Sequence, residues 1–213
     1  SVELVMVPPG QPIPGDCALI VLPGSKATIA DMAAMREQGW DIDILSHYRR
    51  GGRVLGICGG YQMLGRRISD PQGIEGAPGE IAGLGLLDVE TVLTGEKALR
   101  RVAGTAFAQP FTGFEMHMGV TSGPDCDRVF ALLENDRPDG AISPDGRVMG
   151  TYVHGAFAST QLRSALLGML GARSDGIDHS ARVDTALNAI ADELERHLDV
   201  GGLLKLAMGG NDA

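Results

Sequence analysis

The chain has few cysteines, and their spacing excludes two common classes of protein. Cys17, Cys58 and Cys126 are the three in 213 residues, and they form no Cys-x-x-Cys pair and no metal-ligand cluster. An odd, sparse set also differs from the disulfide framework of a secreted domain. We therefore expect reduced thiols, a cytoplasmic location and no metal site, with ordinary structural roles for Cys17 and Cys126.

Positive charge is also scarce. Lys and Arg number 18 against 27 Asp and Glu, which gives a formal net charge of −9. Nucleic acid and anionic membranes attract clustered basic side chains, so we expect neither as a partner. No apolar run approaches the roughly 18 residues that span a bilayer, and the N-terminus lacks a basic-then-apolar signal pattern. Small molecules and other proteins remain as partners.

A third absence is a phosphate-binding loop of the G-x-x-x-x-G-K-[ST] type. The run Gly24-Ser25-Lys26 has neither the upstream glycine nor the spacing of such a loop. The backbone N–H groups of that motif cradle the phosphates of a nucleotide. We therefore expect that ATP does not bind here by that route.

What the chain does contain is an alternation of short apolar runs with helical patterns. This alternation is typical of an α/β domain with a parallel sheet and helices on its faces. A chain of this size is compatible with one domain and a substantial core. The predicted strands span 2–7, 18–22, 54–57 and 86–93, and the predicted helices span 28–38 and 41–50.

The second half is less regular. Residues 73–85 are rich in Gly and Pro and predict a surface loop, whereas 114–153 alternates turns with short strands and predicts a mixed sheet with hairpins. Two helices close the chain, and the second, 181–198, is amphipathic, which predicts that it packs against the sheet. Its apolar face consists of Val183, Leu187, Ile190, Leu194 and Leu198. The end, 208–213, is expected to be frayed.

The stretch from Val54 to Gly60 is the most informative part of the sequence. It predicts a buried strand that runs into a tight turn and a helix, with Cys58 at the turn. Small flanking residues allow the strained backbone of a nucleophile elbow, which presents a nucleophile at the edge of a sheet. A thiol at the start of a helix also experiences the positive end of the helix dipole, which favours the thiolate. Cys58 is therefore the candidate nucleophile.

A nucleophilic cysteine needs a base, and the chain has five histidines. His47, His179 and His197 lie in polar surroundings and are expected at the surface. His154 ends an apolar, strand-like run and precedes a glycine, which is where a catalytic histidine would be presented to a cleft. A structural role for His154 is the alternative.

His117 belongs to a second polar pattern. It alternates with Glu115 on one side of a predicted strand, while Phe114, Met116 and Met118 lie on the other side. The face shared by Glu115 and His117 is either a solvated edge or the wall of a site that faces a ligand. The pattern alone leaves both possibilities open.

A third element follows the strand predicted at 18–22. Gly24 and Ser25 lead into the helix predicted from Thr28, and backbone N–H groups at such a turn can stabilise the oxyanion of an acyl transfer. An ordinary strand-to-helix turn is the alternative. In α/β hydrolases the oxyanion hole combines a loop N–H with the N–H that follows the nucleophile, so Gly24 or Ser25 would act together with Gly59.

In order and spacing, these three elements resemble the class I glutamine amidotransferases. Within that class, nearly the whole chain resembles the carboxy-terminal domain of the cobyric acid synthase family of cobalamin biosynthesis. The segments that carry the resemblance are LPGSKATIAD, GICGGYQMLG, GLGLLDVET, GFEMHMG, TSGPD and GRVMGTYVHG.

The resemblance implies a flavodoxin-like fold with a mostly parallel central sheet, and hydrolysis of glutamine through a cysteine thioester. Cys58 would attack the side-chain amide and His154 would shuttle protons, while Gln62, Glu115 and His117 would line the substrate site. Ammonia would pass to a separate synthetase domain, which uses ATP and Mg²⁺ to amidate carboxylates of adenosylcobyrinic acid a,c-diamide. The domain itself would hold no cofactor, and the corrin would bind mainly elsewhere.

One departure from the wider class concerns the histidine. Many class I amidotransferases carry a glutamate two positions after it, which orients the imidazole, but that position is Ala156 here. An unoriented imidazole is a weaker base, because the third group normally fixes its tautomer and direction. Glu115 is the candidate substitute, although the cobyric acid type also tolerates a Cys–His dyad.

We expect residues 1–200 to form the amidotransferase domain, without its first strand and without the synthetase domain, followed by a tail over 201–213. Two other functions remain open. One is the amidotransferase subunit of a related ligase, such as the one that amidates the peptidoglycan precursor lipid II. The other is a catalytically silent module that channels ammonia or docks a partner.

Overall fold

The computed structural model describes residues 2–174, 176 and 178–208. The chain divides into two compact units, 1–174 and 175–213. The amidotransferase domain predicted over 1–200 stays a prediction. In the described part of the chain, no helix is both long and apolar enough to cross a membrane.

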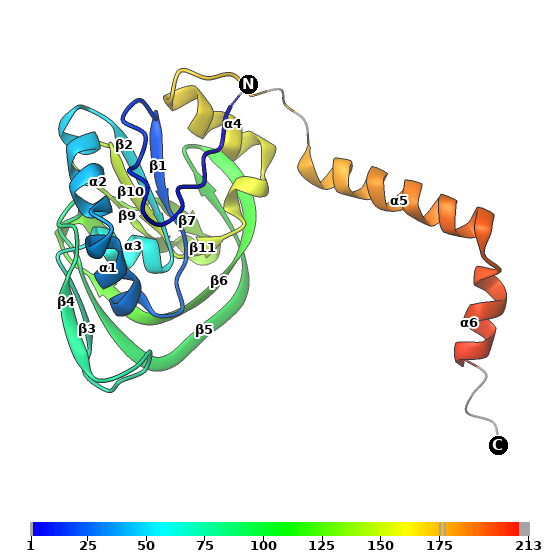
Figure 1. Cartoon of the computed structure of the whole chain (residues 1–213), viewed down its shortest axis with the longest axis horizontal. Helices are drawn as coiled ribbons and strands as arrows, with labels where there is room; N and C mark the ends of the chain where they lie inside the picture. The colour runs from blue at the N-terminus through cyan, green and yellow to red at the C-terminus, as the bar shows by residue number, and fades with distance from the viewer. Residues whose placement is uncertain (1, 175, 177, 209–213) are drawn as a thin grey trace. The chain divides into compact units, whose positions relative to one another are not determined.

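A four-stranded sheet lies at the centre of the first unit (Figure 1). β1 (Leu19–Leu22), β2 (Arg53–Ile57) and β10 (Val148–Thr151) are parallel, and β9 (Ala141–Ile142) is antiparallel beside β10. The apolar composition of these strands suits a sheet that is covered on both faces. Because parallel strands end at the same edge, the segments that follow β1, β2 and β10 meet there.

Helices cover both faces of this sheet, as predicted. α1 (Thr28–Glu37), α2 (Trp40–Arg49) and α3 (Gly59–Leu64) pack on one face. α4 (Thr160–Met169) packs on the other face. The helices predicted over 28–38 and 41–50 are thus confirmed to within one residue at each end.

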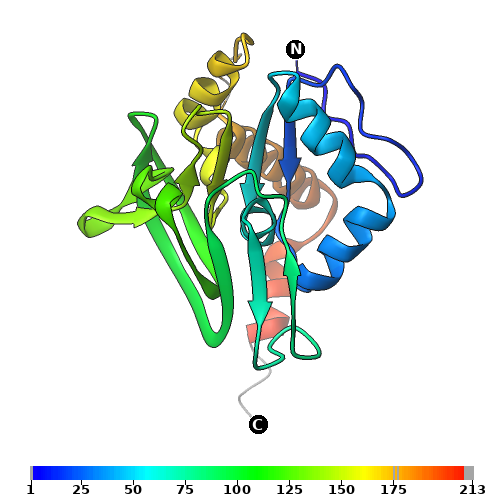
Figure 2. The same cartoon turned by 90° about the vertical axis from the view of Figure 1, so that its left-hand side faces the viewer.

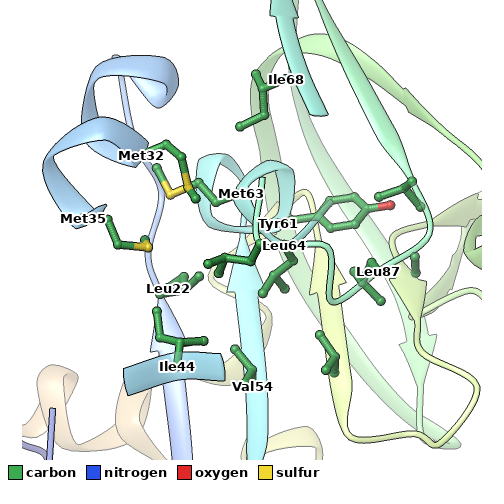
Figure 3. Packing of buried hydrophobic residues seen from close by; sticks show 14 of the residues in the cluster. Leu22, Met32, Met35, Ile44, Val54, Tyr61, Met63, Leu64, Ile68 and Leu87 are labelled. Atoms are coloured by element: carbon green, nitrogen blue, oxygen red, sulfur yellow. The ribbon is translucent and has the colours of Figure 1, made fainter. Parts of the chain in front are cut away.

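Two hydrophobic cores result from the alternation of side chains along the strands. On β2, Val54 belongs to the first core and its neighbour Leu55 to the second. In the first core, methionines of α1 meet aliphatic side chains of β1, α2 and α3 (Figure 3). Its labelled members are Leu22, Met32, Met35, Ile44, Val54, Tyr61, Met63, Leu64, Ile68 and Leu87.

A long antiparallel hairpin dominates a second, mixed sheet. It consists of β5 (Glu90–Ala106) and β6 (Gln109–Ser122), and it turns at Phe107 and Ala108, which both have positive φ angles. Figure 2 shows this green ribbon beside the parallel sheet, on the side opposite α1 and α2. The sheet also contains β11 (Val153–His154), β3 (Arg67–Asp70), β4 (Gly79–Ala82), β7 (Ala131–Leu133) and β8 (Arg137–Asp139). Single-turn 3-10 helices span Pro124–Asp127 and Ala156–Ala158, and the turn Glu134–Asp136 has positive φ angles at Asn135 and Asp136.

The strand predicted over residues 2–7 is wrong. This segment is irregular, and Val2, Leu4 and Met6 are exposed. An apolar run forms a strand only where another strand accepts its hydrogen bonds, and β1 pairs with β2 alone in the described part of the chain.

The strand predicted over 86–93 begins later than expected, at Glu90. The backbone N–H groups of Leu84 and Leu86 instead donate to Met63 and Leu64 at the end of α3, at 2.8 and 2.9 Å. They satisfy carbonyl groups that a helix leaves free at its carboxyl end. The loop predicted over 73–85 likewise contains the short strand β4, which pairs with β3.

The second unit consists of α5 (His179–His197) and α6 (Val200–Met208). The helix predicted over 181–198 is confirmed, and the packing of its apolar face against the sheet stays a prediction. α6 lies in the segment that was predicted to be a tail over 201–213. The residues expected to be frayed, 208–213, lie outside the described residues except for Met208, which ends α6.

Candidate active site

Cys58 lies at the turn between β2 and α3, as predicted. Its φ of 54° and ψ of −113° lie outside the regions that residues with a side chain favour, at a cost on the order of 1–3 kcal/mol. The turn leaves no room for a side chain on the next residue, because a Cβ on Gly59 would lie 2.8 Å from the backbone nitrogen of Ser25. The N–H of Cys58 donates to the carbonyl oxygen of Thr151 at 2.8 Å. Close packing against Ser25 and the hydrogen bond to Thr151 therefore hold the elbow in place.

The thiol of Cys58 is buried, and this burial raises its pKa. The backbone N–H of Gly59 opposes the shift, while the negative charge of Glu75 adds to it. The sulfur donates a hydrogen bond to the carbonyl oxygen of Met116 at 3.5 Å. The N–H of Gly59 at the start of α3 lowers the pKa in the expected direction, but the burial of the sulfur outweighs this effect.

His154 and Cys58 both lie close to Gly24. A Cβ on Gly24 would be 3.1 Å from the Cε1 atom of His154 and 3.6 Å from the Cβ atom of Cys58. The imidazole also stacks on the ring of Phe114, with 5.2 Å between ring centroids and 9° between planes. Its Nε2 atom is buried and has no hydrogen-bond partner among the described residues. The structure thus brings together three residues that the sequence places 34 and 96 positions apart.

Backbone N–H donors lie beside Cys58 and His154. Among the described residues, no protein acceptor takes a hydrogen bond from the N–H groups of Gly24 or Ser25, and the N–H of Gly59 interacts with the thiol of Cys58. The Ser25 hydroxyl is occupied, because it donates to Asp31 Oδ2 at 2.5 Å and accepts from the N–H of Ala27 at 3.0 Å. Ser25 can therefore contribute its backbone N–H rather than its side chain to an oxyanion hole.

Gln62 follows the nucleophile by one helical turn and is buried. Its Nε2 atom donates to the carbonyl oxygen of Met118 at 3.1 Å and to the hydroxyl of Tyr152 at 3.2 Å. Its Oε1 atom accepts from the Thr28 hydroxyl at 3.1 Å. The amide therefore connects α1, α3 and β6 at the edge of the sheet where Cys58 lies.

Glu115 is buried in an ion pair with two arginines. Its carboxylate oxygens lie 2.5 Å from Arg100 Nε and 2.7 and 2.9 Å from the guanidinium nitrogens of Arg137. Burial alone would raise the pKa of Glu115, but Arg137 and Arg100 outweigh it and hold the pKa below its usual range. No hydrogen bond joins Glu115 to His154 in the described structure. The geometry favours a structural role, and the substitution of Glu115 for the absent orienting glutamate stays a prediction.

His117 shares the buried face of β6 with Glu115, while Phe114 and Met116 on the other face are exposed. The face is therefore no solvated edge. The imidazole of His117 stacks on the ring of Tyr152, with 3.8 Å between centroids, and burial lowers its pKa. Through Tyr152 it lies next to Gln62, and its role as a substrate-binding residue remains a prediction.

The histidines that the sequence predicts at the surface differ in their burial. His47 is buried, which corrects the expectation of a surface residue. Its Nε2 atom lies 3.0 Å from the carbonyl oxygen of Arg53, and its Nδ1 atom lies 3.8 Å from the sulfur of Cys17. These contacts anchor α2 to the start of β2. His197 is exposed and pairs with Glu193, as expected, and the side chain of His179 lies outside the described residues.

Three residues near the nucleophile were missed by sequence reasoning. Thr28 and Tyr152 bond to Gln62, and Glu75 bonds to Thr28 through its carboxylate. Thr28 and Tyr152 belong to segments already identified as motifs, so a search for polar residues beside each motif could have found them. Glu75 lies in a Gly/Pro-rich loop that carries no signal. No group of three His, Cys, Asp or Glu suited to a metal occurs among the described residues.

Comparison with known proteins identifies a family that this chain matches. The model of the CobB/CobQ-like glutamine amidotransferase domain matches residues 1–162. The cobyric acid synthase of Rhizorhabdus wittichii is 62% identical over 210 residues, which cover 99% of this chain and 43% of the relative. The cobyric acid synthase of Sphingopyxis alaskensis is 61% identical over 207 residues, which cover 97% and 43%. This chain therefore spans less than half the length of the curated relatives that it matches.

Solved structures support the fold. A crystal structure of a glutamine amidotransferase matches with a TM-score of 0.56 at 20% identity, covering 72% of this chain and 79% of the other. A chain from the structure of PurLQS of Thermotoga maritima matches with a TM-score of 0.53 at 20% identity, covering 73% and 81%. At such identities the likeness concerns the fold alone, and it confirms the predicted flavodoxin-like α/β class.

Proposed function

Because this chain belongs to the CobB/CobQ-like glutamine amidotransferase family, we propose that it hydrolyses the side-chain amide of glutamine with Cys58 as the nucleophile. One observation carries the proposal. Cys58 and His154 both lie close to Gly24, at a place where the N–H groups of Gly24 and Ser25 have no protein acceptor among the described residues and the N–H of Gly59 interacts with the thiol. A nucleophile, a base and free backbone donors are the groups that acyl transfer requires.

The first half of the reaction forms a thioester. The sulfur of Cys58 attacks the amide carbon while His154 takes the thiol proton, and the N–H groups of Gly59 and of Ser25 or Gly24 stabilise the oxyanion. His154 then gives that proton to the departing nitrogen, which leaves as ammonia. The bond formed is C–S and the bond broken is C–N.

The second half releases glutamate. A water molecule attacks the thioester carbon and passes a proton to His154, and the same backbone donors stabilise the second oxyanion. Collapse of this intermediate breaks the C–S bond, and His154 returns the proton to the sulfur of Cys58. The net reaction is hydrolysis of glutamine to glutamate and ammonia, with no change in the enzyme.

The fate of the ammonia follows from the relatives. The curated relatives are named cobyric acid synthase and are more than twice as long as this chain. We propose that the remainder of such a polypeptide uses the ammonia, with ATP and Mg²⁺, to amidate carboxylates of adenosylcobyrinic acid a,c-diamide in cobalamin biosynthesis. This chain then needs no cofactor of its own, and the cytoplasm, where cysteines stay reduced, is its proposed location.

Covalent trapping tests the proposal. A glutamine-like diazoketone, incubated with the full-length protein and followed by peptide mass mapping, is expected to add one label at Cys58. Cys17 and Cys126 serve as internal controls, because neither lies near His154 or the free N–H groups. Cys58→Ala should abolish labelling. No label on the unaltered full-length protein contradicts glutamine hydrolysis and favours a silent docking module.

A further inference from the structure

One face of the long hairpin gathers exposed apolar side chains. Leu99 on β5 lies directly opposite Met116 on β6, and Phe114 follows two positions before Met116. Residues opposite each other, and residues two apart on a strand, point to the same face of a sheet. Leu99 is 67% exposed, and Met116 and Phe114 are exposed as well. We call the face that these three side chains share the outward face of the hairpin.

The opposite face of the same strands is buried. Val102 on β5 and Phe111 on β6 belong to the second hydrophobic core, which lies between the hairpin and the parallel sheet. The hairpin therefore needs its inward face for folding, whereas its outward face is not used within residues 2–174. Apolar residues scattered over a surface are ordinary, but a group gathered on one sheet face marks an interaction site.

The outward face reaches the candidate active site. His154 on β11 lies directly opposite Phe114 on β6, and the two rings stack on the same side of the sheet. The carbonyl oxygen of Met116 accepts from the thiol of Cys58 at 3.5 Å. The apolar group therefore begins at the two side chains that are proposed to break the C–N bond of glutamine.

The relatives indicate a source for the cover of this face. The cobyric acid synthases of Rhizorhabdus wittichii and Sphingopyxis alaskensis match this chain over 43% of their own length. More than half of such a polypeptide is therefore available to pack on it. An interface within one polypeptide forms without the entropic cost of bringing two molecules together.

We propose that the outward face of the β5–β6 hairpin, centred on Leu99, Met116 and Phe114, packs against the part of the full-length polypeptide outside residues 1–213. The position of His154 on this face gives the contact a role. Ammonia released into water becomes ammonium, which has no lone pair for attack on an activated carboxyl group. A partner seated on the outward face keeps water away from the place where ammonia leaves.

The surface and its role rest on different observations. The surface follows from the register and the exposure of Leu99, Met116 and Phe114, and it does not depend on any reaction. The protection of ammonia rests on the proposed glutaminase function. The experiment therefore measures the contact itself, without substrate turnover.

Site-specific photo-cross-linking of the full-length protein tests the contact. A benzophenone-bearing amino acid placed at Leu99 should, after irradiation, form cross-links to peptides outside residues 1–213, identified by mass spectrometry. Arg101, which is exposed and lies opposite Phe114, is a second position on the same face and should give cross-links to the same region. The matched control is Ile42, which is 65% exposed on α2, on the side of the parallel sheet opposite the hairpin (Figure 2). It should lack these cross-links.

A charge on the face tests whether the apolar side chains make the contact. With the benzophenone at Arg101, Leu99→Asp should lower the cross-link yield severalfold, because it places a carboxylate in an apolar interface. Ile42→Asp should leave that yield unchanged. An unchanged yield in Leu99→Asp would show that the contact does not use this face.

The remaining outcomes also decide the inference. Cross-links confined to residues 1–213, or a cross-linked dimer, would name another occupant and overturn it. No cross-link at either Leu99 or Arg101 would show that the face is open to solvent, with the same result. If the benzophenone at Leu99 prevents folding, the Arg101 position carries the test. Failure of the diazoketone to label Cys58 would end the glutaminase function but would leave the cross-linking result standing.

Discussion

The ring of Phe114 lies parallel to the imidazole of His154, with 9° between their planes and 5.2 Å between their centroids. Phe114 and His154 are also cross-strand neighbours on β6 and β11. The ring therefore restrains the direction of a histidine that has no carboxylate two positions later, where Ala156 lies. Stacking on an aromatic neighbour takes over part of the orienting role that a hydrogen bond fills in a triad.

Replacement of Phe114 by alanine should slow glutamine hydrolysis. An aromatic pair contributes about 0.5–1.5 kcal/mol beyond its buried area, so we expect kcat to fall by up to about tenfold. Steady-state release of glutamate measures the effect. Phe114→Tyr retains the ring face and serves as the control, because its rate should stay near that of the unaltered protein. An unchanged kcat in Phe114→Ala would show that the stack does not position His154.

Replacement of Glu115 by glutamine separates two roles for this residue. Loss of charge-assisted hydrogen bonds to Arg100 and Arg137 should lower the free energy of unfolding by roughly 1.5–3 kcal/mol, measured by urea titration. The kcat of the folded variant should stay close to that of the unaltered protein, since no hydrogen bond joins Glu115 to His154 in the described structure. A large fall in kcat with unchanged stability would instead support Glu115 as the group that orients the histidine.

The elbow was predictable because its requirements are local. Cys58 is identified as the nucleophile by a strand, small flanking residues and a helix that follow one another within a few positions. Gly24, just before Ser25, identifies the turn that faces the nucleophile. The partners of Glu115 were not predictable, because the register of the long hairpin brings Arg100 opposite Glu115 and Arg137 comes from β8, another strand of the same sheet. Glu75 escaped notice because it lies in the Gly/Pro-rich loop between β3 and β4, which carries no signal in the sequence.

The direction in which the pKa of Cys58 is shifted could not be read from the sequence. Position at a helix start can be read from a sequence, whereas burial depends on what packs above the turn. Here the sulfur of Cys58 is buried and donates to the carbonyl oxygen of Met116 on β6. Burial outweighs the effect of the Gly59 N–H and raises the pKa of the thiol.

Replacement of Gly60 by alanine should destabilise the elbow severely. A Cβ on Gly60 would overlap the backbone carbonyl group of Leu22, which cannot move without breaking the pairing of β1 with β2. Overpacking of this kind typically costs about 1–3 kcal/mol, and more where backbone must move. Thermal unfolding measures the change. The control is Gly168→Ala in α4, where a Cβ meets nothing within 4 Å and should stabilise by about 0.5–1 kcal/mol.

Asp139 gives the fold a pH dependence of unusual sign. It is buried on β8, and it accepts from the Thr151 hydroxyl at 2.5 Å and from the N–H of Tyr152 at 3.3 Å. Burial raises its pKa to about 6, against the Thr151 and Tyr152 hydrogen bonds that oppose the shift. The folded state thus holds the Asp139 proton more tightly than the unfolded chain does. Between about pH 4 and pH 6, ionisation of Asp139 therefore lowers stability as pH rises.

Replacement of Asp139 by asparagine should remove this dependence. The amide keeps an acceptor oxygen for the N–H of Tyr152 and does not ionise, so the free energy of unfolding of Asp139→Asn should gain relative to the unaltered protein as pH rises from 4 to 8. The relative gain should reach up to about 3 kcal/mol and should level off above pH 7, where Asp139 is fully ionised. Urea unfolding at several pH values measures both proteins. A constant difference across that range would mean that Asp139 ionises at its ordinary pKa despite its burial.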